Sequence, residues 1–254
     1  MIGSYVPEII VFVYGLIVGS FLNVCIYRIP RGESFGLSRS RCPSCGAPIL
    51  YRDLVPVASW LILKGACRRC GSRISPMYPA VELLNGLCWL CAYRAYGFAP
   101  GTPLTALLLS ALIVVAGVDL GHRIIPYSLN AAVAVLAIPY IVFASPEPLT
   151  SHIIGAFVVS LPFYAVAVIT NGSMGGGDVM LMAAAGLFLG YRLVLFALLA
   201  GSVVGAIVCL GLMAAKKAGM KTAVPFGPFL AFGLGLAALW GREIIDWYFR
   251  LFIR

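Results

Sequence analysis

Long stretches without Asp, Glu, Lys or Arg alternate along the chain with short polar segments. A helix needs about 20 apolar residues to cross the hydrocarbon core of a bilayer. Stretches of about that length cover residues 9–27, 95–118, 124–146, 148–177, 193–215 and 222–241. Two weaker stretches are residues 79–96, which carry Glu82 and Arg94, and residues 179–191, which are short. The pattern predicts an all-α polytopic membrane protein with about eight transmembrane helices.

Composition supports this class. Of the 254 residues, 61% are hydrophobic and 11% are charged, whereas soluble domains are about 45–50% apolar and about 25% charged. An ordinary soluble domain and a disordered chain are therefore excluded. The net charge of +9 would suggest nucleic acid in a soluble protein. Here the charges are too sparse and the apolar stretches too long for that interpretation. We therefore expect the protein to contact membrane lipid and to bind no nucleic acid.

Basic residues near the ends of the stretches predict the orientation, because cytoplasmic loops are enriched in Lys and Arg. The one long polar segment, from Arg28 to about Tyr78, is rich in arginine. With this segment in the cytoplasm and eight helices threaded, thirteen of the 18 basic residues fall inside. Both termini then face outward. The first apolar stretch follows Glu8 and lacks a basic leader, so it is predicted to be a span rather than a cleaved signal.

Four of the eight cysteines lie in the polar segment as two Cys-x-x-Cys pairs, Cys42/Cys45 and Cys67/Cys70. A two-residue spacer lets both thiolates of a pair reach one metal, and four thiolates complete a structural zinc site. A glycine follows each second cysteine and permits a tight turn. Two disulfides or four reduced thiols are the alternatives, although a cytoplasmic loop disfavours disulfides. We predict a small cytoplasmic zinc-binding loop.

Two aspartates are predicted at the inner edge of the membrane, where carboxylates are costly and usually functional. Asp178 follows Gly175, Gly176 and Gly177, whose backbone can bend sharply, and Asp119 ends the stretch 95–118. The predicted threading brings both acids to the same side. Two converging carboxylates can share a proton, so that one activates water while the other polarises a scissile carbonyl. The alternative is that each aspartate only caps a helix.

These motifs, in this order, resemble those of the bacterial type IV prepilin peptidases, which are GxGD-type aspartyl proteases of the membrane. The match covers most of the chain. The matching segments are residues 19–30 (GSFLNVCIYRIP), the double Cys-x-x-Cys loop, residues 78–84 (YPAVELL), Asp119 with Ile125-Pro126, residues 175–178 (GGGD) and residues 225–229 (PFGPF).

The resemblance implies a bifunctional enzyme of the bacterial inner membrane whose active site faces the cytoplasm. It implies cleavage of the leader peptide of type IV prepilins and pseudopilins after glycine. It further implies N-methylation of the new N-terminal residue, with S-adenosylmethionine as methyl donor. Asp119 and Asp178 would be the catalytic pair in a peptidase region at 101–254. Residues 1–100, with the first two spans and the cysteine loop, would form the methyltransferase-associated region.

No glycine fingerprint of a nucleotide-binding fold occurs in the loop, which is also too small for that fold. A site for S-adenosylmethionine must then be built from the loop and nearby spans. We name Glu82 as the residue to hold a cationic group there, with an ion pair to a loop arginine as the alternative. The chain departs from the family pattern at Tyr127 and Met180, where relatives often carry Asp and Lys.

A second class of function is a membrane transporter with a zinc-ribbon loop, in which Asp119 and Asp178 bind ions. Transport sites lie near the bilayer midplane, whereas both acids are predicted at the edge. A third interpretation is an assembly scaffold without catalysis, in which both aspartates are dispensable.

Overall fold

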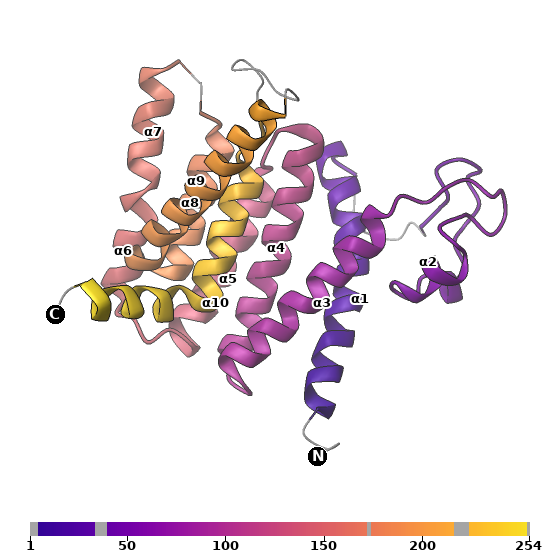
Figure 1. Ribbon diagram of the computed structural model, residues 1–254, viewed down its shortest axis with the longest axis horizontal. Coiled ribbons are helices and arrows are strands. Elements are labelled where there is room, and N and C mark those ends of the chain that lie inside the picture. The colour runs from indigo at the N-terminus through magenta and orange to yellow at the C-terminus, as the bar shows by residue number, and fades with distance from the viewer. Residues whose placement is uncertain (1–4, 34–39, 172–173, 216–223, 253–254) are drawn as a thin grey trace. The chain divides into compact units, whose positions relative to one another are not determined.

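The computed structural model describes residues 5–33, 40–171, 174–215 and 224–252. Helices dominate these ranges, and the only β-structure within them is two isolated bridges, Arg41 with Pro48 and Ala66 with Arg73 (Figure 1). The predicted all-α class is confirmed.

The chain forms two compact units, Met1–Arg94 and Ala95–Arg254, here called unit 1 and unit 2. Unit 1 contains α1 (Val6–Arg28), η2 (Ile29–Arg31), η3 (Tyr51–Asp53), α2 (Ala58–Ile62) and all but the end of α3 (Met77–Tyr96). Unit 2 contains α4 (Gly101–His122), α5 (Tyr127–Phe143), α6 (Leu149–Val158), α7 (Ser160–Ile169), α8 (Gly176–Leu189), α9 (Tyr191–Ala214) and α10 (Gly227–Phe252).

Every predicted span corresponds to helix in the described residues. Five segments are long and apolar enough to cross a membrane: Val6–Arg31, Gly101–His122, Leu149–Ile169, Tyr191–Ala214 and Gly227–Leu251. The apolar helices α5 and α8 are shorter, with 17 and 14 residues. A multi-pass membrane protein is thus confirmed, while the count of eight spans stays a prediction. Residues 172–173 and 222–223 of the predicted spans lie outside the described residues.

The predicted stretch 148–177 is broken into α6 and α7 at Val159. Pro162 stands in the first turn of α7. A proline ring has no N–H to donate and clashes with the carbonyl four residues earlier, which here belongs to Val158. A hydropathy pattern does not include this backbone effect of proline. It therefore shows residues 148–177 as one continuous stretch.

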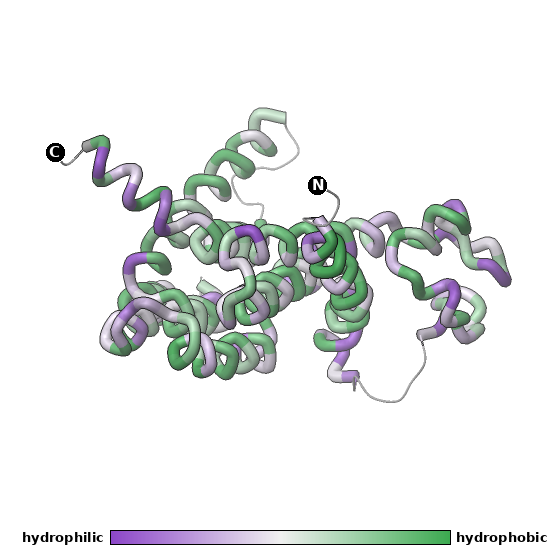
Figure 2. The backbone as a smooth tube through the Cα atoms, turned by 90° about the horizontal axis from the view of Figure 1, so that it is seen from below, coloured by the Kyte–Doolittle hydropathy of each residue, from purple (hydrophilic) through white to green (hydrophobic). Residues whose placement is uncertain are grey.

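Helix α10 continues well beyond the predicted end of its span at residue 241. Charged residues after Gly241 end the apolar stretch, but they do not end the helix. Figure 1 shows this last part of α10, in yellow beside the C-terminus, turning across the direction of the first part. In Figure 2 its colours alternate between hydrophilic and hydrophobic, as in a helix that lies in a membrane interface.

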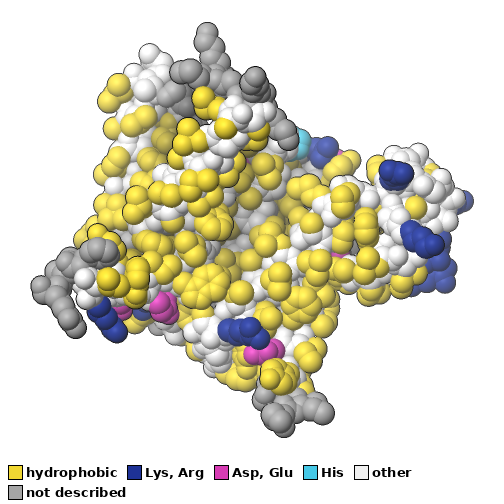
Figure 3. Space-filling model, viewed as in Figure 1, with side chains coloured by type: hydrophobic (Ala, Val, Ile, Leu, Met, Phe, Trp, Pro, Cys, Tyr) yellow, Lys and Arg dark blue, Asp and Glu magenta, His cyan; other side chains and the backbone are white. Residues whose placement is uncertain are grey.

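Helices of unit 2 pack closely through small residues. Gly155 of α6 and Gly186 of α8 face each other so tightly that a Cβ on either would collide with the other's backbone. Leu181, Met182 and Phe188 of α8 are fully buried. Large apolar side chains also cover the outer face of the bundle, as Figure 3 shows in yellow, which is the surface expected against lipid.

The two ends of unit 2 differ in chemistry. At one end α4 finishes and α5, α8 and α10 begin; we call it the aspartate end, because it holds Asp119 and Asp178. At the opposite end α5 and α8 finish and α6 and α9 begin. Helix α8, with 14 residues, separates the two ends by about 20 Å at 1.5 Å per residue.

Candidate active site and metal centre

Asp119 lies in the last turn of α4 and points at the start of α10. The helix closes because Arg123 adopts a left-handed conformation, φ 56°, and its N–H donates to the Asp119 carbonyl. The Asp119 side chain is buried, and its Oδ2 accepts a hydrogen bond of 2.8 Å from the Gly227 N–H. The first N–H groups of a helix are unpaired and carry partial positive charge. The start of α10 thus stabilises a negative Asp119.

A side chain at position 227 would displace the Asp119 carboxylate. A Cβ there would stand 2.7 Å from Asp119 Oδ2 and 3.0 Å from its Cγ. The sequence pattern marks residues 225–229 only as part of the resemblance and does not assign Gly227 to the site. The available signal was Pro228, because proline is favoured in the first turn of a helix, but nothing in the sequence pairs this helix start with Asp119.

Asp178 lies in the first turn of α8, which follows Gly175 as N-cap. Gly177 in that turn presses against the segment after Asp119: a Cβ on it would stand 2.8 Å from Ile125 Cβ and 2.9 Å from the Ile125 carbonyl oxygen. Gly176 has more room, because a Cβ added to it would lie 3.8 Å from its nearest neighbour, the Tyr127 hydroxyl. The close approach at Gly177 holds the two aspartate segments together, and Asp178 lies within electrostatic range of Asp119.

Asn130 adds a hydrogen bond to this contact. Its Nδ2 donates to the Gly177 carbonyl over 3.2 Å, and the side chain is 2% exposed. Its Oδ1 is buried and has no hydrogen-bond partner among the described residues. Sequence reasoning missed Asn130; the signal was a lone amide near the start of the apolar stretch 124–146.

The cysteine loop of unit 1 contains two nearly identical turns. In the first, the Cys42 N–H donates to Ala47 and the Gly46 N–H to Cys42; in the second, Cys67 and Gly71 make the equivalent bonds. Gly46 and Gly71 have φ of 68° and 71°, in the left-handed region that favours glycine. The tight turns predicted behind each cysteine pair are confirmed.

The four cysteine sulfurs converge. All lie within 4.8 Å of one another, none is in a disulfide, and Cys42 Sγ is 3.8 Å from Cys70 Sγ. Tetrahedral zinc with Zn–S bonds of about 2.3 Å requires sulfurs about 3.8 Å apart. The residues present fit a zinc ion.

An ion pair braces the same loop. The Arg68 Nε and Nη2 atoms donate to both carboxylate oxygens of Asp53 over 2.7–3.1 Å, and the Asp53 side chain is only 8% exposed. Hydrogen bonding to Arg68 holds the pKa of the Asp53 carboxyl below its ordinary value. The pair therefore stabilises the folded loop above the ordinary Asp pKa, and this stabilisation is lost as the pH falls through the lowered pKa.

Glu82 is buried in α3, and its carboxylate anchors the loop. Its Oε2 accepts a hydrogen bond of 2.7 Å from the N–H of Val57, which has φ 60°, an uncommon conformation for a β-branched residue. Helix α1 approaches closely here, since a Cβ on Gly19 would stand 2.8 Å from Glu82 Cα. No ion pair of Glu82 with a loop arginine occurs in the described residues. Contact of Glu82 with a methyl donor stays a prediction.

Two family models match the chain. Residues 13–96 match the Bacterial Peptidase A24 N-terminal domain, and residues 106–210 match the Type IV leader peptidase family. A "Prepilin leader peptidase/N-methyltransferase" of Aeromonas salmonicida is 35% identical, with 94% of this chain and 92% of the relative covered. The protein of the same name in Bacillus subtilis is 33% identical, over 95% and 98%. The chain belongs to the type IV leader peptidase family.

A further relative, a "Type 4 prepilin-like proteins leader peptide-processing enzyme" of Escherichia coli, is 37% identical over 89% of this chain and 91% of its own. No solved structure matches the chain. The first family match falls almost wholly within unit 1 and the second within unit 2. The leader peptidase family match thus includes both Asp119 and Asp178, whereas Gly227 lies beyond it.

Substitution of Gly227 by alanine tests the contact with Asp119. Alanine in a helix is ordinarily more stable than glycine by about 0.5–1 kcal/mol. We expect Gly227→Ala to lower stability instead, by about 1–3 kcal/mol, because the methyl group displaces a buried carboxylate from its donor. Thermal unfolding of the purified protein in detergent measures this.

Gly121→Ala is the matched control, because Gly121 is helical, lies two residues after Asp119, and has nothing within 4 Å of an added Cβ. It should leave the unfolding temperature unchanged or raise it. Equal effects of the two substitutions would show that the close contact at Gly227 does not exist.

Proposed function

We propose that this protein is a membrane aspartyl endopeptidase that removes the leader peptide of type IV prepilins and pseudopilins, and then N-methylates the new N-terminal residue. Relatives of that name align over nearly the whole chain. The observation that carries the proposal is the Ile125–Gly177 contact, which brings the segments of Asp119 and Asp178 to one end of a membrane-helix bundle.

Asp119 and Asp178 take different roles in the proposed reaction. The Gly227 N–H bond favours ionised Asp119, so Asp119 accepts a proton from the attacking water. Asp178 carries the proton of the pair and donates it toward the oxygen of the scissile carbonyl. The water oxygen bonds to the carbonyl carbon. The tetrahedral intermediate then expels the amine, which takes up a proton from Asp119, while the reforming carbonyl returns a proton to Asp178. Gly176, where an added Cβ would meet nothing closer than 3.8 Å, leaves room for the substrate backbone near Asp178.

The proposed orientation follows from the basic residues. The cysteine loop faces the cytoplasm, and so does the aspartate end, because an even number of spans separates the loop from Asp178. Cleavage then occurs on the cytoplasmic side of the bacterial inner membrane, after glycine, beside the apolar helix of the prepilin. Both termini face outward.

For the methyl transfer, the proposal assigns a structural zinc ion to Cys42, Cys45, Cys67 and Cys70, and S-adenosylmethionine as the methyl donor. The donor supplies an electrophilic methyl group to the new amine. Convergence of the four sulfurs supports the zinc assignment. Asp53 and Glu82 support the loop by holding Arg68 and the Val57 N–H.

A transporter function is not favoured. Transport sites lie near the middle of the membrane, whereas Asp119 is in the last turn of α4 and Asp178 in the first turn of α8. Both positions are helix ends rather than helix centres. A scaffold without catalysis predicts that both aspartates can be replaced without loss of function.

Replacement of either aspartate tests the catalytic pair. Asp119→Asn and Asp178→Asn should each lower prepilin cleavage by at least about 10³-fold, because an amide neither accepts nor shares the proton. Mass spectrometry of the pilin N-terminus, with and without S-adenosylmethionine, measures cleavage and methylation separately. Glu243→Gln, at an exposed position of α10, should retain wild-type activity. A folded Asp119→Asn or Asp178→Asn protein that cleaves at the wild-type rate would refute the assignment.

The zinc assignment predicts about one zinc ion per chain in reduced protein. Cys42→Ser should remove most of this zinc, because three thiolates leave the tetrahedral shell open. Methylation should fall at least as much as cleavage, since the loop belongs to unit 1 and the aspartates to unit 2. Elemental analysis gives the zinc content. Cys209→Ser, which removes a thiol from α9 outside the cluster, should change neither the zinc content nor methylation. Zinc-free wild-type protein would overturn the assignment.

A further inference from the structure

Charged residues gather at the end of unit 2 opposite the aspartates. Glu147 comes from the loop after α5, Arg192 from the first turn of α9, and Arg242 and Asp246 from the last part of α10. They line a pocket of about 220 Å³. The proposed peptidase uses none of these four residues, and Figure 3 shows charged side chains in this region, beside an otherwise apolar bundle.

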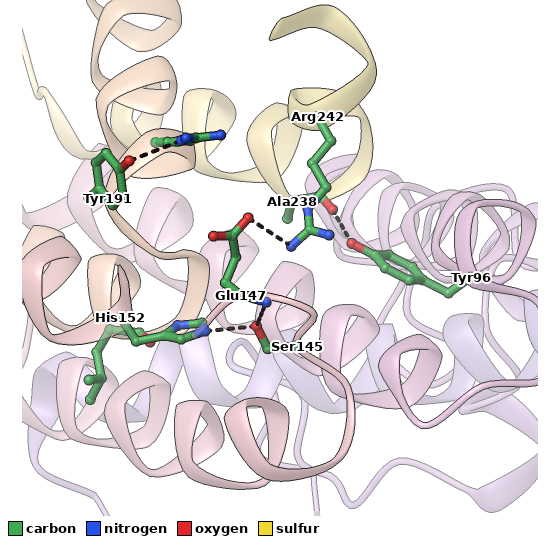
Figure 4. A network of polar contacts seen from close by, with 9 residues as sticks. Tyr96, Ser145, Glu147, His152, Tyr191, Ala238 and Arg242 are labelled. Carbon is green, nitrogen blue, oxygen red and sulfur yellow. Dashed lines mark hydrogen bonds and ion pairs between the residues drawn. The ribbon is translucent and has the colours of Figure 1, made fainter. Parts of the chain in front are cut away.

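A buried hydrogen-bond network fixes the position of Glu147. His152 is fully buried, with Nδ1 2.9 Å from the Leu187 carbonyl and Nε2 2.7 Å from Ser145 Oγ (Figure 4). A carbonyl only accepts, so Nδ1 carries the proton and Nε2 of the neutral ring accepts from the Ser145 hydroxyl. Ser145 Oγ in turn accepts the Glu147 N–H over 3.1 Å. The charged loop is therefore tied to α8.

The four charges in the pocket are only loosely paired. The Arg242–Glu147 distance is 3.9 Å, at the limit of an ion pair. Arg192 donates through Nε to the hydroxyl of Tyr191 over 3.0 Å (Figure 4). Within the described ranges no carboxylate lies within ion-pair distance of Arg192, and no Lys or Arg does so for Asp246. Two positive and two negative groups thus retain capacity to bind a partner that carries both signs.

An apolar groove adjoins this pocket and shares Arg192 and Ile245 with it. Its volume is about 650 Å³. It runs between the first turns of α9 and the last part of α10, where residues four apart form continuous apolar rows. The rows consist of Leu195, Phe196 and Leu199 on α9 and of Ile245 and Phe249 on α10.

The last part of α10 indicates where this groove lies in the membrane. Trp247, Tyr248 and Phe249 are about half exposed, and Arg250 follows them. Aromatic residues of this kind concentrate at the membrane–water interface, and an amphipathic helix that turns across a bundle lies in that plane. The charged pocket is then at the depth of lipid headgroups, and the groove is at the depth of acyl chains.

We propose that this end of unit 2 binds a phosphatidylethanolamine molecule, with an acyl chain in the groove and the headgroup in the pocket. Its phosphate pairs with Arg192, and its ammonium donates to Asp246 and Glu147. An anionic headgroup would leave Asp246 without a cation, since only Glu147 has an arginine, Arg242, within ion-pair distance. A choline headgroup carries its positive charge without an N–H donor, so it offers Asp246 no hydrogen bond. The lipid belongs to the leaflet opposite the aspartate end.

Native mass spectrometry of the full-length protein from detergent tests this site. The protein is offered equal amounts of phosphatidylethanolamine and phosphatidylcholine with identical acyl chains. We expect about three- to tenfold more phosphatidylethanolamine bound, the ratio that one net hydrogen bond supplies. Asp246→Ala, which removes one of the two proposed acceptors, should lower this ratio toward one, and Arg192→Gln should weaken binding of both lipids. Retained prepilin cleavage shows that the variants are folded.

Glu243→Gln and Arg250→Gln are matched controls, since they remove one charge of each sign from the same part of α10 outside the pocket. Both should keep the wild-type ratio. Equal binding of the two lipids to the wild type would overturn the proposal, as would control variants that lose the preference. Phosphatidylglycerol that displaces phosphatidylethanolamine, or a lipid-free dimer in the spectrum, would also overturn it by identifying an anionic lipid or a second copy as the occupant.

Discussion

Close approach of helix backbones is the constraint on which unit 2 depends. Apolar side chains gain little by leaving lipid, so membrane helices associate through tight packing and interhelical hydrogen bonds. Gly155 against Gly186 joins α6 to α8, and Gly177 against Ile125 joins the start of α8 to the segment after α4. The same closeness lets the Gly227 amide reach Asp119. Helix packing and the candidate active site therefore both depend on positions where glycine lets two backbones approach closely.

The placement of charge follows from the cost of burying it. In the described part of unit 2, acidic and basic side chains lie near helix ends, in the loop before α6 or on the last part of α10, where backbone N–H groups or water can stabilise them. At the aspartate end, Asp119 accepts a hydrogen bond from a backbone amide, and Asp178 lies close enough to interact electrostatically with Asp119. At the opposite end, Arg192, Arg242, Glu147 and Asp246 balance each other in sum without close pairing. The two ends of unit 2 therefore differ in how their charges are stabilised, and this difference underlies the two roles proposed for them.

The loop of unit 1 depends on polar contacts and its cysteine cluster for stability, because it is too short to build a hydrophobic core. Paired turns bring the four cysteine sulfurs together, and Asp53 with Arg68 closes the loop from another side. Glu82 then links the loop to α3 through the Val57 amide. A residue that sequence patterns mark as a ligand candidate serves in the structure as an anchor, because its partner is a backbone group that no pattern reveals.

The sequence by itself determined the helical class, the approximate spans, the cysteine cluster and the two aspartates, because hydropathy, ligand spacing and rare intramembrane charge are local signals. Only the tertiary structure decided that Gly227 and Asn130 join the aspartate segments, since these contacts bridge 108 and 47 residues of chain. It also decided the turn of α10 across the bundle. Such features depend on which backbone atoms meet in space, and the order of residues does not encode that meeting locally.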